Sequence, residues 1–261
     1  MTAGQVVTPQ VEVVTRGPVS ELLIGRGAKR NALTGAGWSE LAERVAELGR
    51  GEDVRAVVIR GRDGGFCAGS DITEWTDAEL DAVEDSFARM ESAFRAVEEC
   101  PVPVLAEVRG IAAGAGCQLA LACDLRFMGE AARIGMPIAR LGIMCSPAFA
   151  ARMVALVGPS STRRLLYTGS LLDAPAAAAG GLVDEHLPEA ELADHVTAVA
   201  GSIANQPRSA VVAAKRAVNA ALAPAREATR WNGNPAVSAA DFRTGITTFL
   251  HRSRPAAEQP T

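Results

Sequence analysis

The sequence lacks any apolar run long enough to cross a membrane. Its apolar stretches are interrupted by charged residues well before the roughly 20 consecutive apolar residues that a membrane-spanning helix requires. The first ten residues, MTAGQVVTPQ, also lack a basic segment followed by an apolar one, which is the pattern of a secretory signal. We therefore expect no signal peptide, no membrane partner and a cytoplasmic location.

The sequence also lacks an excess of basic residues. It has 26 Lys and Arg against 30 Asp and Glu, which gives a formal net charge of −4. Binding to a phosphate backbone requires a concentrated basic surface, and the longest basic cluster here is the pair Arg252 and Arg254. We expect no nucleic-acid partner.

Paired cysteines and histidine clusters are absent too. No C-x-x-C pair occurs, and the three histidines all lie in the C-terminal third. This pattern excludes the usual metal and disulfide motifs, so we expect reduced thiols, no metal and no prosthetic group. The five scattered cysteines are Cys67, Cys100, Cys117, Cys123 and Cys145.

What the chain does have is enough apolar sequence for one substantial core, since 48% of its 261 residues are apolar. Residues that favour β-structure flank Gly17-Pro18 and predict a hairpin, and Thr34 is expected to cap a helix. Strands that alternate with helices, followed by a helical tail, predict an α/β fold whose βα turns stack in layers. The expected strands are 11–15, 19–24, 54–60, 102–108, 124–128 and 133–135; the expected helices are 35–49, 78–99, 115–122, 147–156, 160–168, 174–180, 189–205, 208–222 and 236–251, with 169–173 as a loop.

Two glycine-bearing turns are the most informative feature. Residues 66–72 (FCAGSDI) and 110–119 (GIAAGAGCQL) each follow an apolar run and precede a helix-like one. A lone turn of this kind more often indicates tight packing. Two such turns can instead aim two free backbone N–H groups at one point, which makes an oxyanion hole for negative charge on a carbonyl oxygen. The pattern indicates acyl-group chemistry through an enolate or a tetrahedral intermediate.

The segments FCAGSDI and PVPVLAEVRGIAAGAGCQLALACDLRF closely resemble the two signatures of the crotonase superfamily, the enoyl-CoA hydratase/isomerase-like proteins. The resemblance runs from KRNAL at 29–33 through LYTG at 166–169 and AGGLV at 179–183 to Phe249. It implies a crotonase-like ββα superhelix over residues 1–188 and a C-terminal helical trimerisation region over 189–261. It also implies acyl-CoA as substrate or ligand, and a homotrimer or a dimer of trimers.

By this resemblance the two oxyanion-hole N–H groups belong to Ser70 and to Ala115, and neither side chain is used. Alanine at 115, where relatives have glycine, requires a negative φ or a compensated strain. The hydroxyl of Ser70 is alternatively a helix cap, although Asp71 is the stronger candidate for that role.

Family hydratases carry two glutamates, and the matching positions here are Gln118 and Ile138. Glutamine cannot abstract a proton and isoleucine has no polar atom, so the resemblance implies that two-carboxylate hydration has lost both its acid and its base. The single-carboxylate isomerase pattern is missing as well. Ser146 falls where dehalogenase-like and hydrolase-like relatives carry a carboxylate, but no histidine is evident to activate it.

Other charged residues are candidates to replace the missing groups. Glu91 lies at the margin of the apolar face of the long acidic helix and is the preferred base, with a solvated surface position as the competing interpretation. Arg140 is a candidate clamp for a substrate carboxylate, or else a turn cap. Glu74 and Glu107 are weaker candidates, and Glu107 is alternatively a partner of Arg109.

The resemblance also assigns contacts with coenzyme A. The expected residues are Lys29, Arg30 and Ala32 near the nucleotide and pantetheine, Ala68, Asp71 and Ile72 on the adenine side, and Phe249 and Arg252 in the tail, where many relatives reach a CoA bound to a neighbouring subunit. The basic tail is alternatively a solvated helix end.

Three functions remain open at this point. The first is an acyl-CoA enzyme that stabilises a thioester enolate without ordinary hydration, for example in decarboxylation or a related lyase reaction. The second is a non-catalytic acyl-CoA binding or carrier protein on the same scaffold. The third is a polyketide-type relative that takes its acyl group from a carrier protein.

Overall fold

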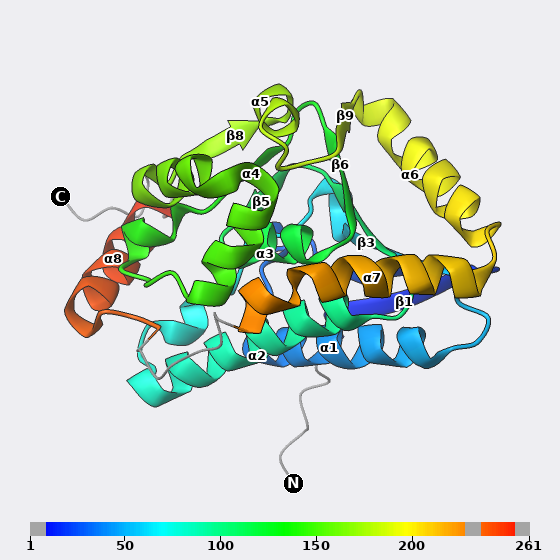
Figure 1. Ribbon diagram of the computed structural model, residues 1–261. Coiled ribbons are helices and arrows are strands. Elements are labelled where there is room, and N and C mark those ends of the chain that lie inside the picture. The colour runs from blue at the N-terminus through cyan, green and yellow to red at the C-terminus, as the bar shows by residue number, and fades with distance from the viewer. Residues whose placement is uncertain (1–8, 228–235, 254–261) are drawn as a thin grey trace, which may run out of the picture.

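The computed structural model describes residues 9–227 and 236–253 (Figure 1). Within these residues a six-stranded sheet runs in the order β1-β2-β3-β4-β6-β9. The first two strands form the expected antiparallel hairpin, and the others pair in parallel. The strands are β1 (Val11–Arg16), β2 (Val19–Ile24), β3 (Ala56–Gly61), β4 (Val104–Val108), β6 (Leu125–Gly129) and β9 (Glu185–Leu187).

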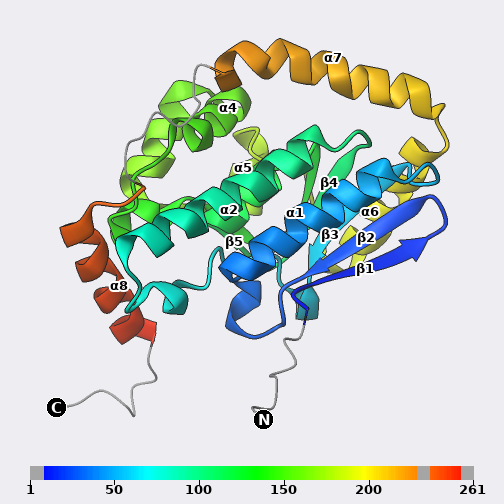
Figure 2. The same ribbon diagram turned by 90° about the horizontal axis from the view of Figure 1, so that it is seen from below.

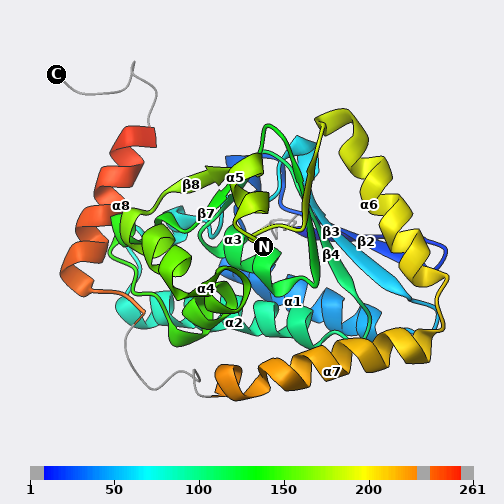
Figure 3. The ribbon, with the colours of Figure 1, turned by 45° about the horizontal axis from the view of Figure 1, so that its top comes forward.

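Helices cover both faces of this sheet, which explains why all five residues of β4 are buried. On one face lie α1 (Gly35–Arg50), α2 (Leu80–Glu99) and α3 (Ala115–Ala122), with α1 and α2 side by side (Figure 2). On the other face lies α6 (Glu189–Ala204), which packs Leu192 and Val196 against the sheet (Figure 3). The start of the expected C-terminal region is therefore part of the packing around the central sheet.

A second, short sheet stands beside the carboxyl end of β4. It has the order β5-β7-β8, formed by β5 (Ile111–Ala113), β7 (Arg133–Gly135) and β8 (Leu171–Asp173). The expected loop at 169–173 was wrong for its last three residues, 171–173, which pair antiparallel with β7. The remaining elements of this region are the turns η1 (Lys29–Asn31), η2 (Arg62–Gly64), η3 (Ile72–Trp75) and η4 (Pro137–Leu141), and the helices α4 (Pro147–Thr168) and α5 (Ala174–Ala179).

Two further helices follow α6. In α7 (Arg208–Glu227), the Nζ atom of Lys215 lies 2.7 Å from a carboxylate oxygen of Asp124 and so ties the helix to the core. In α8 (Ala239–Ser253), Phe242 packs against Trp75 with ring centroids 5.7 Å apart, and the helix contacts η4. None of the helices in the described ranges is long and apolar enough to span a membrane.

Candidate active site

The two glycine turns pair with each other through their backbones. The N–H of Cys67 donates to the carbonyl of Ile111 over 2.9 Å, and the N–H of Ala113 donates to the carbonyl of Cys67 over 3.1 Å. Glycine is required at the closest approaches: a Cβ on Gly116 would lie 1.9 Å from the Cys67 oxygen, and one on Gly69, where φ is +106°, would lie 2.9 Å from the Ala113 oxygen. The signature segments therefore interlock.

In the first turn, the backbone leaves the N–H of Ser70 unused. Leu33 pairs with both neighbours of Ser70: its N–H donates to the Gly69 carbonyl over 2.9 Å, and its carbonyl accepts from the Asp71 N–H over 2.8 Å. In this parallel pairing the N–H of Ser70 points away from Leu33. Among the described residues it has no hydrogen-bond partner.

In the second turn, Ala115 is the first residue of α3, so its N–H has no partner within the helix. Gly114 occupies the N-cap position with φ of 55°, but glycine has no side chain to cap the helix, and the first turn has no acidic residue. The positive end of the helix dipole is therefore not neutralised by a side chain. The φ angle of Ala115 is not positive, so alanine fits this position without the strain of a left-handed backbone. A Cβ on Gly69 would lie 3.4 Å from the Ala115 nitrogen, so the two N–H groups are neighbours.

The residues at the two expected glutamate positions have very different surroundings. Ile138, on η4, is buried, and its Cγ2 would lie 3.8 Å from a Cβ on Gly114, so a methyl group faces the second turn. Gln118 is fully buried on α3. Its amide nitrogen lies 3.4 Å from the carbonyl oxygen of Phe149, and its amide oxygen lies 3.5 Å from Nη1 of Arg152. Both ends of the amide therefore face protein groups over long, weak contacts.

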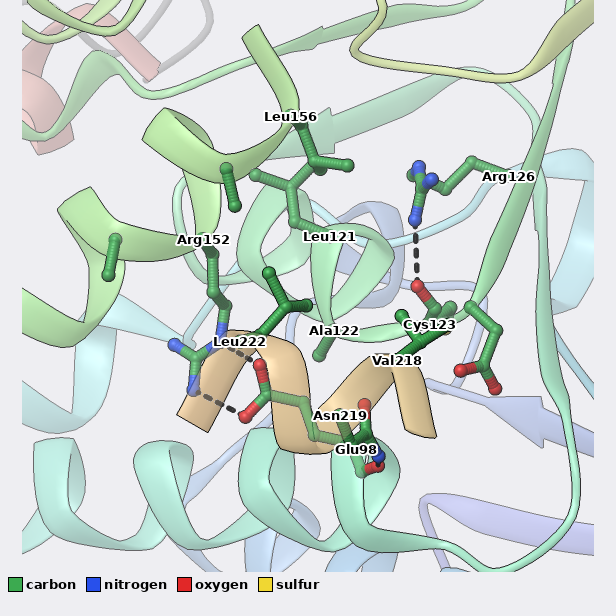
Figure 4. Close-up of a pocket in the computed structure, with 13 residues that line it drawn as sticks. Glu98, Leu121, Ala122, Cys123, Arg126, Arg152, Leu156, Val218, Asn219 and Leu222 are labelled. Carbon is green, nitrogen blue, oxygen red and sulfur yellow. Dashed lines mark hydrogen bonds and ion pairs between the residues drawn. The ribbon is translucent and has the colours of Figure 1, made fainter. Parts of the chain in front are cut away.

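Arg152, which the sequence interpretation missed, holds the preferred base. This buried residue of α4 contacts both oxygens of Glu91 at 2.5 and 3.2 Å. It also contacts both oxygens of Glu98, at 2.9 and 3.3 Å (Figure 4). Burial works to lower the pKa of Arg152, but its hydrogen bonds and charge interactions with the two glutamates outweigh burial and raise that pKa. The guanidinium stays charged, and the Glu91 carboxylate is occupied by an ion pair.

A sequence signal for this cluster existed. Glu91 and Glu98 are seven positions apart, which places both carboxylates on the same face of α2 beside its apolar stripe. Two carboxylates in such a place require a cation. The sequence does not say which cation, because Arg152 lies in an ordinary alanine-rich helical run far along the chain.

The remaining candidates for the chemistry also have structural partners. Ser146 caps α4, since its hydroxyl accepts a hydrogen bond from the N–H of Phe149 over 3.1 Å. Arg140 is exposed, and its Nε would lie 3.2 Å from a Cβ on Gly169, at the carboxyl end of α4. A cation is electrostatically favourable near the carboxyl end of a helix.

Of the two weaker acids, Glu107 pairs with Arg109 at 2.9 Å, as the alternative interpretation expected. Glu74 accepts a hydrogen bond from the N–H of Gly35 at the start of α1 over 2.8 Å. Neither carboxylate contacts the two turns through these bonds.

Two of the residues expected to contact CoA, Lys29 and Arg30, lie in an unusual turn. Lys29, Arg30 and Asn31 all have left-handed backbone, with φ between 51° and 59°. The buried amide of Asn31 stabilises this conformation by accepting from the N–H of Gly27 over 2.8 Å and donating to the Arg62 carbonyl over 2.7 Å. The turn leaves the side chains of Lys29 and Arg30 exposed.

This turn adjoins the first glycine turn. The N–H of Ala68 donates to the Arg30 carbonyl over 3.0 Å, and Nζ of Lys29 lies 2.6 Å from Asp71. Asp71 also caps η3 through the N–H of Thr73, as expected. Burial would raise the pKa of Asp71, but the hydrogen bonds from Lys29 and Thr73 together hold it below its ordinary value.

Four further residues were expected to contact CoA. Ala32 and Ile72 are half-buried in these same segments, and Phe249 on α8 is 41% exposed. Arg252 lies in the last turn of α8, and its side chain is outside the described residues.

The cysteine thiols in the two turns are unreactive at neutral pH. Cys67 and Cys117 are fully buried, and burial raises the pKa of each to about 12. A thiol with such a pKa is not a nucleophile at neutral pH. In the described part of the chain, no group of three or more His, Cys, Asp or Glu could hold a metal ion.

A cavity of about 180 Å³ lies at the other end of α3 (Figure 4). It is lined by Leu121, Ala122 and Arg152 together with residues of α7 such as Val218 and Leu222. With a rise of about 1.5 Å per residue, Leu121 lies about 9 Å along the helix from Ala115. This cavity is therefore separate from the space beside the two turns.

A model of the enoyl-CoA hydratase/isomerase family matches residues 16–260. The chain belongs to this family. It is 34% identical over 201 residues to a crotonyl-CoA hydratase of Syntrophomonas wolfei, covering 76% of each protein, and 30% identical to the 2,3-dehydroadipyl-CoA hydratase of Escherichia coli, covering 90% of this chain and 92% of that protein.

The fold agrees with this membership. A crystal structure of an enoyl-CoA hydratase from Mycobacterium avium subsp. paratuberculosis matches with a TM-score of 0.82 at 28% identity, over 94% of this chain and 97% of that one. A putative enoyl-CoA hydratase/isomerase family protein from Hyphomonas neptunium matches with a TM-score of 0.80 at 29% identity, over 94% and 91%. The crotonase-like α/β fold with a helical C-terminal part is thus confirmed.

Proposed function

We propose that this protein binds an acyl-CoA thioester and stabilises the enolate of that thioester with the backbone N–H groups of Ser70 and Ala115. One observation carries the proposal: two N–H groups without partners among the described residues lie side by side, one of them at the uncapped start of a helix. Such donors are fixed before the reaction, so they stabilise developing charge without reorganisation.

We further propose that the chemistry is not ordinary two-glutamate hydration. Gln118 and Ile138 stand where the family resemblance expects the acid and the base, and neither can exchange a proton with water. Glu91 is paired with Arg152 and Arg140 lies against Gly169, so we place neither of them in the proposed chemistry. Several relatives are named as hydratases, so the rate of enoyl-CoA hydration is the activity to compare between this protein and an ordinary hydratase.

Decarboxylation of a malonyl-type CoA fits a site with a hole and no base. The electron pair of the breaking carbon–carbon bond stays with the thioester as an enolate, and CO₂ leaves. The enolate then takes a proton from solvent. The charge that develops on the thioester oxygen is the charge that the two N–H groups stabilise.

A second candidate is a non-catalytic acyl-CoA binding protein. It is favoured by the internal contacts of Gln118, whose amide nitrogen and oxygen both face protein groups, and by the methyl groups of Ile138 beside Gly114. Such a site holds a thioester without a group that transfers a proton.

The deciding experiment incubates the purified protein with crotonyl-CoA and with malonyl-CoA and follows thioester products. We expect crotonyl-CoA hydration at least about 100-fold below that of an ordinary hydratase, because each missing acid or base is worth about 10²–10⁴-fold. Release of CO₂ from malonyl-CoA supports the enzyme. Thermal stabilisation by both thioesters without turnover supports the binding protein. Hydration with a kcat of about 10 per second or more contradicts both.

A matched variant tests the reason for the low hydration. Replacing Gln118→Glu and Ile138→Glu together rebuilds the expected pair and is predicted to raise hydration above that of the unchanged protein. The single variant Gln118→Glu is the control, since its new carboxylate would lie beside Arg152 and lack a second acid.

We also propose that the protein assembles as a homotrimer or a dimer of trimers through its C-terminal helices. The support is the family resemblance together with the exposed Phe249 on α8. Analytical ultracentrifugation at micromolar concentration tests it, and a stable species of 27.1 kDa contradicts it.

A further inference from the structure

Trp38 of α1 is fully buried, and its indole N–H reaches the turn that carries the proposed hole. Its Nε1 atom lies 2.9 Å from the hydroxyl oxygen of Ser70, and that hydroxyl lies 2.9 Å from Sδ of Met90 on α2. The Ser70 hydroxyl therefore accepts from the indole and directs its own hydrogen at the sulfur. It caps no helix, because Asp71 caps η3.

This hydrogen bond is not an inevitable result of burying a tryptophan. Trp75 is also buried, yet its indole nitrogen has no hydrogen-bond partner in the described part of the chain. A buried indole N–H is usually paired, and leaving one unpaired costs free energy. The fold tolerates this cost at Trp75, so satisfying an indole N–H does not by itself require a hydroxyl at position 70.

The hydrogen bond from Trp38 acts on Ser70, whose backbone N–H is one of the two donors of the proposed hole. Two hydrogen bonds between Leu33 and the neighbours of Ser70 hold its backbone on one side, and the N–H faces the other way. The Gly69 carbonyl, which accepts from Leu33, belongs to the same planar peptide as the Ser70 N–H. The side chain of Ser70 is a further attachment, because it contacts Trp38 on α1 and Met90 on α2. The backbone bond and the side-chain contacts together oppose rotation of the Gly69–Ser70 peptide, which Gly69 alone would allow easily.

We propose that Trp38 is a positioning residue for the oxyanion hole: its indole N–H anchors the Ser70 side chain and so fixes the direction of the Ser70 N–H. This role gives a reason for serine at position 70, because serine has a hydroxyl oxygen that accepts a hydrogen bond from the indole and alanine has none. This inference rests on the proposed function, since it concerns the same hole. It does not depend on which reaction follows binding.

The test compares two ligands that differ at one group. Acetyl-CoA has the thioester carbonyl, and S-ethyl-CoA has a methylene in its place, so the ratio of their dissociation constants measures what the hole contributes. Titration calorimetry gives this ratio for the unchanged protein and for Trp38→Phe, which keeps an aromatic ring and removes the N–H. We expect the preference for acetyl-CoA to fall about two- to tenfold in Trp38→Phe, as for loss of one well-aligned hydrogen bond.

Two variants separate positioning from simple stability. Trp75→Phe removes an indole N–H that has no partner within residues 9–227 and 236–253, so we expect it to keep the full preference for acetyl-CoA. Ser70→Ala perturbs the core less than Trp38→Phe and should lower the preference to a similar extent. Combining Trp38→Phe with Ser70→Ala leaves no unpaired polar group, so the unfolding midpoint should partly recover relative to Ser70→Ala alone while the preference stays low.

A spectroscopic measurement gives an independent answer. The infrared carbonyl stretch of bound ¹³C-labelled acetyl-CoA should lie at lower frequency than that of the free ligand, and this downshift should be smaller in Trp38→Phe and Ser70→Ala. If the unchanged protein shows neither preference nor downshift, the proposed hole is wrong. If it shows both and the folded Trp38→Phe and Ser70→Ala variants keep them in full, the hole stands and the positioning role of Trp38 is overturned.

Discussion

The proposed hole consists of backbone groups, whereas the cluster of Arg152 with Glu91 and Glu98, beside Gln118, consists of side chains. The turns interlock through peptide groups and glycines, so their geometry does not depend on which side chains the neighbouring positions carry. The charged cluster depends on side chains from α2 and α4 that meet only in the folded protein. The geometry of the proposed backbone site therefore does not depend on which side chains stand at positions 118 and 138.

The largest expected effect is on the charged cluster. Arg152→Met removes the guanidinium that pairs with Glu91 and Glu98, and breaking a buried pair in this way costs about 3–5 kcal/mol of unfolding free energy. Urea denaturation measures the loss. The matched control is Arg44→Met, whose exposed partner Glu47 stays in water, and we expect an unchanged midpoint. A loss below about 1 kcal/mol for Arg152→Met, within the range of exposed pairs, would mean that the cluster is not a buried unit.

The next effect is on the backbone side. In Gly116→Ala the new Cβ would overlap the Cys67 carbonyl oxygen, which is backbone and cannot swing aside. We expect a loss of about 1–3 kcal/mol together with loss of the preference for acetyl-CoA over S-ethyl-CoA. Gly201→Ala is the control, because a Cβ there meets nothing within 4 Å and alanine favours the helix α6. Retained preference in Gly116→Ala would show that the two turns are not fixed by this contact.

The smallest effect concerns Asp71 beside the first turn. Its pKa is lowered in the folded protein, so the stability it contributes is present above its ordinary value of 3.8 and is lost as the pH falls through the lower folded value. Asp71→Asn should therefore be less stable than the unchanged protein near neutral pH, and the difference should shrink in acid below pH 3.8. Thermal melts across this range measure it; a difference that stays constant with pH would contradict the role of the charge.

Elements whose signals are local were predicted well. The hairpin around Gly17-Pro18, the Thr34 cap of α1 and the start of α3 at Ala115 follow from short-range conformational preferences, and the structure confirms them. The stop at Gly158-Pro159 is present as a kink with φ of 70°, after which the chain continues in α4. The helices expected over 147–156 and 160–168 therefore both lie within α4, on the two sides of this kink.

Elements that exist only through distant pairing were missed. β5, β8 and β9 each have three residues, too few for an alternating pattern, and they are strands because β7 or β6 lies beside them. The candidate site shows the same contrast between local and distant signals. The two turns could be predicted from their glycines. The pairing of Glu91 with Arg152 joins positions 61 residues apart, and no local sequence pattern predicts it.

The two cysteines in the glycine turns bear on how this site withstands oxidants. Peroxide attacks thiolates that solvent can reach, and it converts them to acids that occupy more space. Cys67 and Cys117 are inaccessible and, with pKa values near 12, almost entirely protonated at neutral pH. Although Cys67 and Cys117 lie in the two turns, the proposed hole is built from peptide groups that peroxide does not modify, and we expect these two thiols to stay reduced for as long as the fold is intact.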